Sequence, residues 1–291
     1  MNLSTFIPNS SKVDVRLWIK VIVYGLLLIN FAIYFKNDWV IASHTMRNGG
    51  SFLDWTGAFA TTIDESAWIC LLILFELETY ILSDEPLPRA KALLMHAVRI
   101  ICYVSLAHTL YAYTDYLIDL SNVDVISNAT NLCQLVAADV SYAYNLVYTE
   151  LNTTNCQILS TASQFYYLDA PENIIVSDSA GLNIEINLAW ADVIEVVAWL
   201  IILLTMELTV RIQDRGIATG TKLKVLKIIK LMFYLILWAI IVFWLDLEHW
   251  MFAWDEFVWI SGFFVIEMNM SQWRDEIIEA ENNEKQNTVS G

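Results

Sequence analysis

The stretch that decides the fold runs from residue 63 to residue 78 and reads IDESAWICLLILFELE, an apolar run with acids at both ends. Asp64 is followed by Trp68 four residues later and by Glu76 eight residues after that. Two further segments carry the same spacing of an acid, a Trp and a Glu, namely Glu195/Trp199/Glu207 and Asp255/Trp259/Glu267. The sequence therefore predicts an internal unit that occurs three times.

The similarity extends beyond this signature. A shift of 131 residues aligns residues 63–115 with residues 194–246 without a gap. The helices expected to precede the three signatures share a weaker pattern, a cation followed four residues later by Tyr, at Lys20/Tyr24, Arg99/Tyr103 and Lys230/Tyr234. Each unit is therefore expected to be a hairpin of two helices.

The composition places these units in a membrane. Of the 291 residues, 57% are hydrophobic and 16% are charged, and 32 acids against 16 Lys and Arg give a net charge of −16. So apolar a composition excludes a disordered chain. The negative charge argues against nucleic acid as a partner, because phosphates are bound by cationic surfaces.

Six apolar segments are candidate membrane spans, because a spanning helix needs about 20 mostly apolar residues. Four are clear, at 17–36, 94–114, 193–211 and 225–245, and two are interrupted by glutamates, at 66–83 and 257–273. The repeat supports the two weaker spans, since each matches the clear span at 193–211. We expect an all-α membrane protein, a bundle of six transmembrane helices built from three two-helix hairpin repeats.

The distribution of cations predicts the orientation. Lys and Arg flank the expected starts of the first, third and fifth spans, whereas residues 100–210 contain neither. Under the positive-inside rule both termini are cytoplasmic, in a plasma or bacterial inner membrane. The expected organisation is a cytoplasmic N-terminus (1–16), transmembrane helices 1–3 (17–115), an extracytoplasmic insertion (116–190), transmembrane helices 4–6 (191–273) and an acidic disordered cytoplasmic tail (274–291).

The insertion is expected to be a small α+β unit. Apolar residues at helical spacing predict an amphipathic helix over 129–150, and two short apolar segments predict strands at 173–176 and 182–186. Cys133 and Cys156 lie in the insertion and are candidates for a disulfide in an oxidising compartment.

The deep glutamates suggest one function. Glu76 lies about 18 Å along a helix from Asp64, well inside a bilayer core of about 30 Å. Ionisable groups at that depth are costly unless they are paired or functional. In a channel or transporter, the deep glutamates would converge to bind or relay a cation: Glu76, Glu207 and Glu267, with Glu65 and Glu256 on the same helix faces. Acids at the outer mouth would concentrate cations there, namely Asp64, Glu195 and Asp255.

A structural interpretation uses the same residues. The glutamates would then hydrogen-bond to Tyr24, Tyr103 and Tyr234, or meet cations that reach up from the inner interface, namely Arg16, Lys20, Arg99 and Lys230. These contacts would lock the helices together, while Trp68, Trp199 and Trp259 would support the bundle. The protein would be a noncatalytic membrane subunit or scaffold that packs against copies of itself or other membrane subunits, with the acidic insertion as a docking domain.

No motif predicts an enzyme or a cofactor. The sequence contains no phosphate-binding glycine loop, zinc-protease pair or haem-attachment motif, although a bound cation is compatible with it. One short turn holds three potential metal ligands, Asp246, Glu248 and His249. The alternative for that turn is an ordinary solvated connection.

Overall fold

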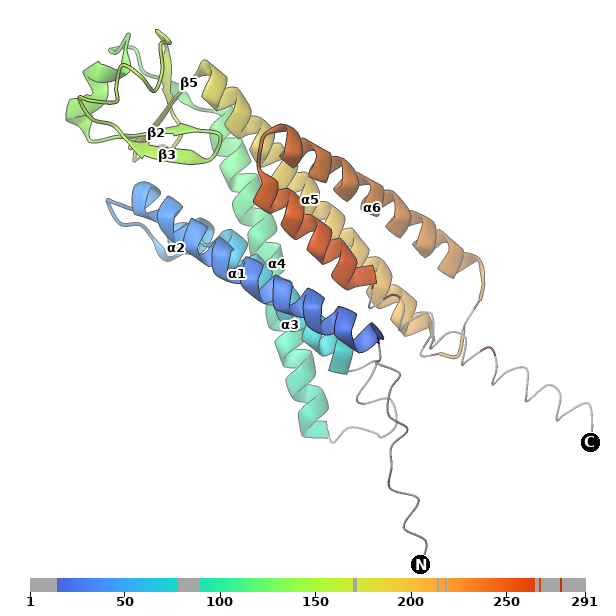
Figure 1. The fold of residues 1–291 in the computed structure, drawn as a ribbon. Helices are drawn as coiled ribbons and strands as arrows, with labels where there is room; N and C mark the ends of the chain where they lie inside the picture. The colour runs from blue at the N-terminus through green and yellow to red at the C-terminus, as the bar shows by residue number, and fades with distance from the viewer. Residues whose placement is uncertain are drawn as a thin grey trace, which may run out of the picture.

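The computed structural model is a bundle of long helices with a small β-sheet at one end (Figure 1). It describes residues 15–77, 89–169, 172–213, 215–217, 219–264, 267 and 278. The helices are α1 (Val15–Thr45), α2 (Phe52–Ala58), α3 (Ala60–Glu76), α4 (Arg89–Ser121), α5 (Ser179–Gln213) and α6 (Thr221–Asp246), followed by a helix over residues 250–264.

Four of these helices are long and apolar enough to cross a membrane: α1, α4, α5 and α6. Helices α2 and α3 would form a fifth span as a bent pair, with a 71° break at Phe59. The exposed side chains of α1, α4 and α6 include large apolar residues such as Ile22, Leu94 and Leu235, which suits contact with lipid. Two of the six predicted spans, 66–83 and 257–273, are only partly covered, because residues 78–83 and most of 265–273 lie outside the described residues.

A side chain of α1 stabilises the start of α3 after the break. Asp38 on α1 accepts hydrogen bonds through Oδ2 from the backbone N–H of Thr62 at 2.9 Å and from its hydroxyl at 2.6 Å. Thr62 lies in the first turn of α3, where backbone N–H groups have no partner within the helix. A side chain from the neighbouring helix thus caps α3 at its new start.

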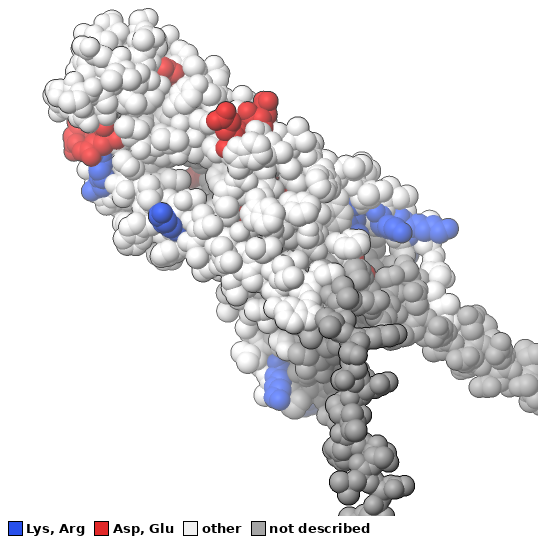
Figure 2. All heavy atoms as spheres, viewed as in Figure 1, with Lys and Arg blue, Asp and Glu red and all other residues white. Residues whose placement is uncertain are grey.

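Helices that follow each other in the chain pack side by side. Contacts join α3 to α4, α4 to α5, α5 to α6 and α1 to α3. The helix starts of α1 and α6 lie at the end of the bundle away from the sheet, and the helix 250–264 runs toward that same end (Figure 1). The cations near these ends lie far from the sheet, whereas much of the visible acidic surface lies near it (Figure 2).

The sheet forms a cap with strand order β1-β4-β5-β2-β3. Its elements are β1 (Asp124–Val125), the 3-10 helix η3 (Leu132–Ala138), β2 (Ser141–Tyr144), β3 (Val147–Glu150), β4 (Phe165–Tyr167) and β5 (Ile175–Asp178). The predicted helix over 129–150 is wrong. Asn145 and Leu146 both adopt positive φ, which makes the two-residue turn of a hairpin between β2 and β3.

The second predicted strand, 182–186, is also wrong, because α5 begins at Ser179. Asp178 caps this helix: its Oδ1 accepts hydrogen bonds from the backbone N–H groups of Ala180 at 3.0 Å and Gly181 at 2.9 Å. The helix therefore starts 11 residues before the predicted end of the insertion at residue 190, and α4 continues to Ser121, past the predicted start of the insertion at residue 116.

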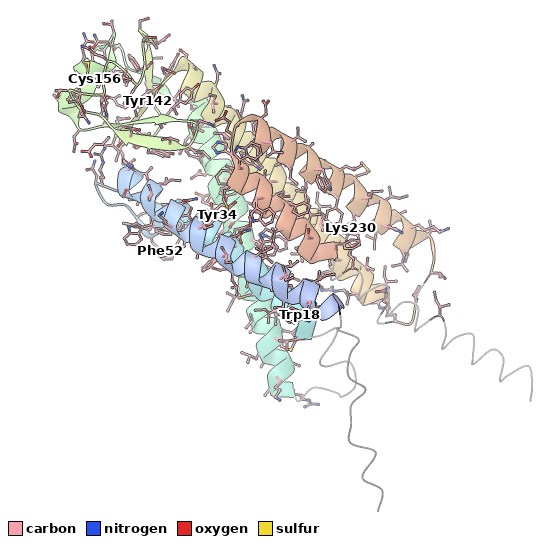
Figure 3. The ribbon with its side chains drawn as sticks, viewed as in Figure 1. Trp18, Tyr34, Phe52, Tyr142, Cys156 and Lys230 are labelled. Carbon is pink, nitrogen blue, oxygen red and sulfur yellow. A yellow bond between two sulfur atoms is a disulfide. The ribbon has the colours of Figure 1, made fainter. Side chains whose placement is uncertain are left out.

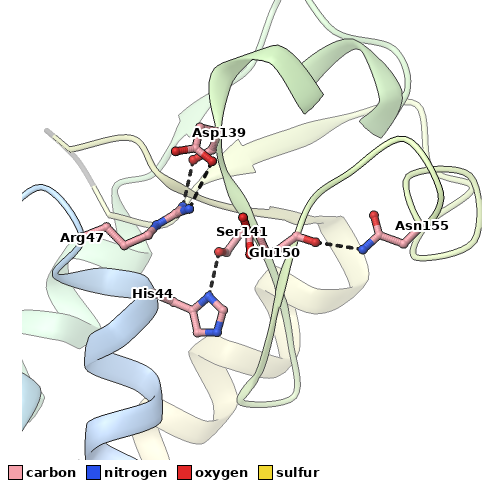
Figure 4. Close-up of polar contacts among 6 residues, drawn as sticks. All are labelled: His44, Arg47, Asp139, Ser141, Glu150 and Asn155. Atoms are coloured by element: carbon pink, nitrogen blue, oxygen red, sulfur yellow. Dashed lines mark hydrogen bonds and ion pairs between the residues drawn. The ribbon is translucent and has the colours of Figure 1, made fainter.

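The cap has its own core and is tied to the bundle. Leu132, Val140, Phe165 and Val176 are fully buried in it, and Cys133 is disulfide-bonded to Cys156 (Figure 3). Arg47, just after α1, donates a hydrogen bond to the carbonyl oxygen of Asp139 at 2.8 Å, and His44 Nδ1 lies 2.9 Å from Ser141 Oγ (Figure 4). The cap thus rests on the end of α1.

Candidate functional site: an acid-lined cavity

The deep glutamates are held by the helix that precedes each of them. Glu76 on α3 accepts hydrogen bonds from Lys20 Nζ at 2.8 Å and from the Tyr24 hydroxyl at 2.8 Å, both on α1. A cation and a Tyr four residues apart share one face of a helix, so both reach the same carboxylate.

The same arrangement occurs at Glu267, which accepts from Lys230 Nζ and from the Tyr234 hydroxyl, each at 2.9 Å. Among the described residues, these contacts remain between α6 and the helix that follows it. They do not join one deep glutamate to another.

The third glutamate, Glu207 on α5, accepts a 2.5 Å hydrogen bond from the Tyr103 hydroxyl of α4. Arg99 Nε lies 3.7 Å from Glu207 Oε1, and Arg211 Nε lies 3.9 Å from Oε2. All three contacts support the structural interpretation of the deep glutamates. A carboxylate that is paired with a cation and a hydroxyl can remain charged in an apolar region.

The three signature tryptophans meet in the core. The ring centroid of Trp68 lies 5.8 Å from that of Trp199 and 6.3 Å from that of Trp259. Phe263 packs against all three rings. These are favourable aromatic separations, so the tryptophans form a packed centre between α3, α5 and the helix 250–264.

Several outer acids accept hydrogen bonds from indole N–H groups. Trp259 donates to Glu65 Oε1 at 2.9 Å, and Trp199 donates to Glu256 Oε2 at 3.2 Å. Two further contacts of this kind among the described residues are Trp244 to Glu195 at 3.2 Å and a hydrogen bond between the side chains of Trp68 and Asp64. Asp255 accepts from the buried Asn30 amide at 2.5 Å. The outer acids are thus fixed in position by neutral donors rather than by cations.

A cavity of about 740 Å³ lies beside this centre, between α1, α3, α4, α5 and the cap. Figure 2 shows a recess between the cap and the helices with acidic atoms inside it. Eleven carboxylate side chains line the cavity, and no Lys or Arg lines it in the described part of the chain: Asp38, Asp54, Asp64, Glu65, Asp115, Asp119, Asp169, Glu172, Asp192, Glu195 and Asp255.

Two of these carboxylates have an oxygen that lacks a hydrogen-bond partner within the described residues, Glu65 Oε2 and Asp64 Oδ1. Glu65 is 5% exposed, its carboxyl group hydrogen-bonds to that of Asp255, and Asp64 lies within electrostatic range of it. Leaving a buried carboxylate oxygen unpaired is costly, and neighbouring like charges increase that cost. Protons or a bound cation would relieve it.

The cap side of the cavity includes Asp169. Burial raises the pKa of Asp169 to about 6, although backbone N–H groups of Ile174 and Ile175 donate to its carboxylate and oppose the shift. Asp169 is therefore mostly ionised at neutral pH and gains protons as the pH falls below about 6.

The described residues contain no group of three His, Cys, Asp or Glu side chains placed to hold a metal ion. The structure therefore does not bring Asp246, Glu248 and His249 together as a metal site. Instead, His249 Nε2 lies 2.9 Å from Asn145 Oδ1 in the turn of the cap hairpin, and Asn145 donates to the carbonyl oxygen of Leu247 at 3.1 Å. These contacts tie the turn to the cap, and burial lowers the pKa of His249.

The cavity unites some of the residues singled out in the sequence and omits others. Asp64, Glu65, Glu195 and Asp255 line it together with Trp68 and Trp199, whereas Glu256 and the three deep glutamates do not. The sequence reasoning missed seven lining acids on α1, α2, α4, α5 and the cap: Asp38, Asp54, Asp115, Asp119, Asp169, Glu172 and Asp192. Two of these acids could have been found from the sequence, because Asp115 and Asp119 follow Tyr111 at intervals of four residues and so share one face of α4 with it.

Comparisons of the chain with protein-family models, with curated protein sequences and with solved structures found no match.

Proposed function

We propose that the chain is an integral membrane protein whose outer cavity binds cations, as the entry site of a cation channel or transporter. The observation that carries this proposal is the lining of the cavity, eleven carboxylates without a Lys or Arg among the described lining residues. A cavity lined by one sign of charge with low-dielectric walls focuses the field and raises the local concentration of counter-ions.

The proposed architecture is six spanning helices in three hairpins, with both termini on the cytoplasmic side. Its support is the recurrence of one contact, a cation and a Tyr on one helix that hold a Glu on the next: Lys20/Tyr24/Glu76, Arg99/Tyr103/Glu207 and Lys230/Tyr234/Glu267.

The tryptophan contacts add a second support. Trp259 donates to the acid at position 65, and Trp199 donates to the acid at position 256, each on a different repeat. Threefold symmetry would direct Trp68 to the matching position on α5, which is Val196. Val196 cannot accept a hydrogen bond, and Trp68 interacts instead with Asp64 on its own helix.

The cavity proposal is tested with the purified chain in proteoliposomes. We expect uptake of a monovalent or divalent cation that falls at least several-fold in the double variant Glu65→Gln/Asp255→Asn. The variant Glu150→Gln, which changes an exposed acid of β3 outside the cavity, is the matched control and should transport normally. Absence of cation uptake and of saturable cation binding by the parent protein would refute this function.

The topology is tested by cysteine labelling in intact cells with a membrane-impermeant maleimide. A Cys at Thr153, an exposed residue of the cap, should be labelled from outside, and a Cys at Lys224, near the start of α6, only after permeabilisation. The reverse result would place the cap in the cytoplasm and overturn the proposed orientation.

A second candidate function is a noncatalytic membrane subunit or scaffold, whose partners are copies of this chain or other membrane proteins. The pairing of the deep glutamates within their own hairpins favours it, since such contacts stabilise a bundle without moving an ion. A stable oligomer by native mass spectrometry, together with no cation binding, would favour the scaffold over the transporter.

A further inference from the structure

The chemistry of the cavity distinguishes between an inorganic ion and an organic cation. A volume of about 740 Å³ lies within the range of cavities that enclose small organic molecules, and it is far larger than a single ion needs. The absence of a three-ligand metal group in the described part of the chain points the same way. A metal ion needs several ligands at one point.

The carboxylates are instead distributed along the cavity. Asp64 and Glu65 come from α3, Asp115 and Asp119 from α4, and Asp169 from the cap. An elongated ligand with several positive groups can reach separate carboxylates, whereas a compact ion can reach only one group of them.

Aromatic rings line the same cavity. Tyr34 stacks on Phe252 with a centroid distance of 5.8 Å, and Trp244 packs edge-on against Phe252 at 5.2 Å. Trp68 and Trp199 add a second ring pair. Ring faces attract ammonium groups, and their apolar surface accommodates the methylene chains between such groups.

An independent observation shows where one positive group would bind. Glu65 is 95% buried and lines the cavity, and its Oε2 receives no N–H or hydroxyl donor among the described residues. Its carboxyl group instead hydrogen-bonds to the carboxyl group of Asp255, so two buried acids meet at this point of the lining. A primary ammonium has three N–H donors and a positive charge, so it would satisfy this oxygen and offset the nearby charge of Asp255.

From this combination of spread carboxylates, aromatic walls and a buried Glu65–Asp255 carboxyl pair, we infer that the cavity binds a linear polyamine, an organic cation with two or more ammonium groups joined by methylene chains. The inference rests on the proposed cation-binding function and assigns its ligand class.

Isothermal titration calorimetry on the purified full-length chain in nanodiscs tests the ligand class. The probes are spermidine, butylamine, MgCl2 and KCl at matched ionic strength. Spermidine should bind saturably and at least about tenfold more tightly than butylamine, because one ammonium reaches only one of the separated carboxylates. Mg²⁺ and K⁺ should bind more weakly than spermidine.

Variants locate the site. Glu65→Gln should raise the Kd for spermidine at least about tenfold, because it removes a charge that is desolvated in the complex. The double variant Asp115→Asn/Asp119→Asn changes two exposed residues at the cavity rim, so it should fold even if Glu65→Gln does not, and it should also weaken binding. Glu150→Gln should leave the Kd within about twofold.

The outcomes separate the two proposals. Mg²⁺ or K⁺ binding that depends on Glu65, without tighter spermidine binding, would overturn the polyamine inference and leave the cation site standing. Spermidine binding that is weakened equally by Glu150→Gln and by the cavity variants would show attraction to the acidic surface and also overturn it. Failure of all four probes to bind would remove both proposals.

Discussion

Lys20 on α1 and Glu76 on α3 form a buried ion pair, with 2.8 Å between Nζ and Oε2 and with side chains that are only 11% and 17% exposed. The pair joins the first helix to the bent segment that the hydropathy of the sequence left doubtful. Its neighbour Tyr24 adds a neutral donor to the same carboxylate. Because the two charges lie between apolar helices, each is costly without the other.

This relationship predicts a strong coupling between the two residues. Lys20→Met and Glu76→Gln should each destabilise the protein, by about 3 kcal/mol for the variant that leaves a bare buried charge. The double variant should recover much of that loss. Apparent melting temperatures of the three variants in detergent measure the coupling, and Lys91→Met, at an exposed position of α4, is the control. Additive effects in the double variant would contradict the ion pair.

The Trp259–Glu65 hydrogen bond predicts a second effect on stability. Trp259→Phe keeps an aromatic ring in the core but removes the N–H that Glu65 Oε1 accepts at 2.9 Å. Leaving that buried oxygen without a donor should cost about 1–3 kcal/mol. Thermal unfolding followed by circular dichroism checks this, with Trp254→Phe at an exposed position as the matched control. Equal losses for both variants would mean that the N–H makes no specific contribution.

Gly181 predicts a steric effect at the junction of the cap and α5. A Cβ on this residue would lie 3.2 Å from the Ala143 carbonyl oxygen and 3.1 Å from Tyr144 Cδ2, and closer still to Ser177 Oγ. Ser177 cannot move freely, because its hydroxyl donates to the same Ala143 oxygen at 2.7 Å. Gly181→Ala should therefore destabilise the protein by about 1–3 kcal/mol.

The control for Gly181→Ala is Gly25→Ala in α1, where a Cβ would meet no atom within 4 Å. Alanine has the higher helix propensity, so this change should be neutral or stabilising by up to about 1 kcal/mol. The changes in unfolding free energy of both glycine variants are measured by chemical or thermal unfolding in the same detergent. A Gly181→Ala protein as stable as the parent would show that the cap and α5 are less tightly joined than described.

Asp169 predicts a dependence of stability on pH. Its pKa is about 6 in the folded protein and near 3.8 in an unfolded chain, so between these values the folded state holds a proton that the unfolded state has lost. Its contribution to stability is therefore largest at low pH and falls as the pH rises from about 4 to about 6.

The variant Asp169→Asn removes this titration. The difference in unfolding free energy between variant and parent should shift in favour of the variant by on the order of 1 kcal/mol between pH 4.5 and pH 7. Comparing differences cancels the titration of groups that do not interact with Asp169, as well as any constant effect of Asn on the hydrogen bonds from Ile174 and Ile175. A difference that does not change with pH would show that Asp169 is as well solvated as a surface acid.

The sequence predicted the apolar helices well, because spans of about 20 apolar residues have few alternatives in water or lipid. The segments 17–36, 94–114, 193–211 and 225–245 all lie within α1, α4, α5 and α6. The helix ends were less predictable. Asp178 and Ser179 look like a polar turn in the sequence, but the Asp178 carboxylate accepts two backbone N–H groups and starts α5 there.

The cap was predicted as α+β, but its details were not. The apolar spacing over 129–150 fits a helix as well as it fits η3 and the β2–β3 hairpin. Two positive-φ residues, Asn145 and Leu146, decide between them, and Asn145 is held by His249 and Leu247 from the far end of the chain. Local periodicity carries no information about such long-range contacts.

The sequence by itself determined the spacing of acid, Trp and Glu, because i,i+4 and longer helical periods fix which side chains share a face before any partner is known. Only the tertiary structure decided what those faces meet. Of the partners that the sequence offered, it gave Glu76 Lys20, and it brought Asp115 and Asp169, far apart in the chain, to the same cavity as Glu65. The physical reason is that the helices packed against a carboxylate decide its hydrogen-bond partners and its degree of burial. Partners and burial in turn set the free-energy cost of its charge and the function that it can serve.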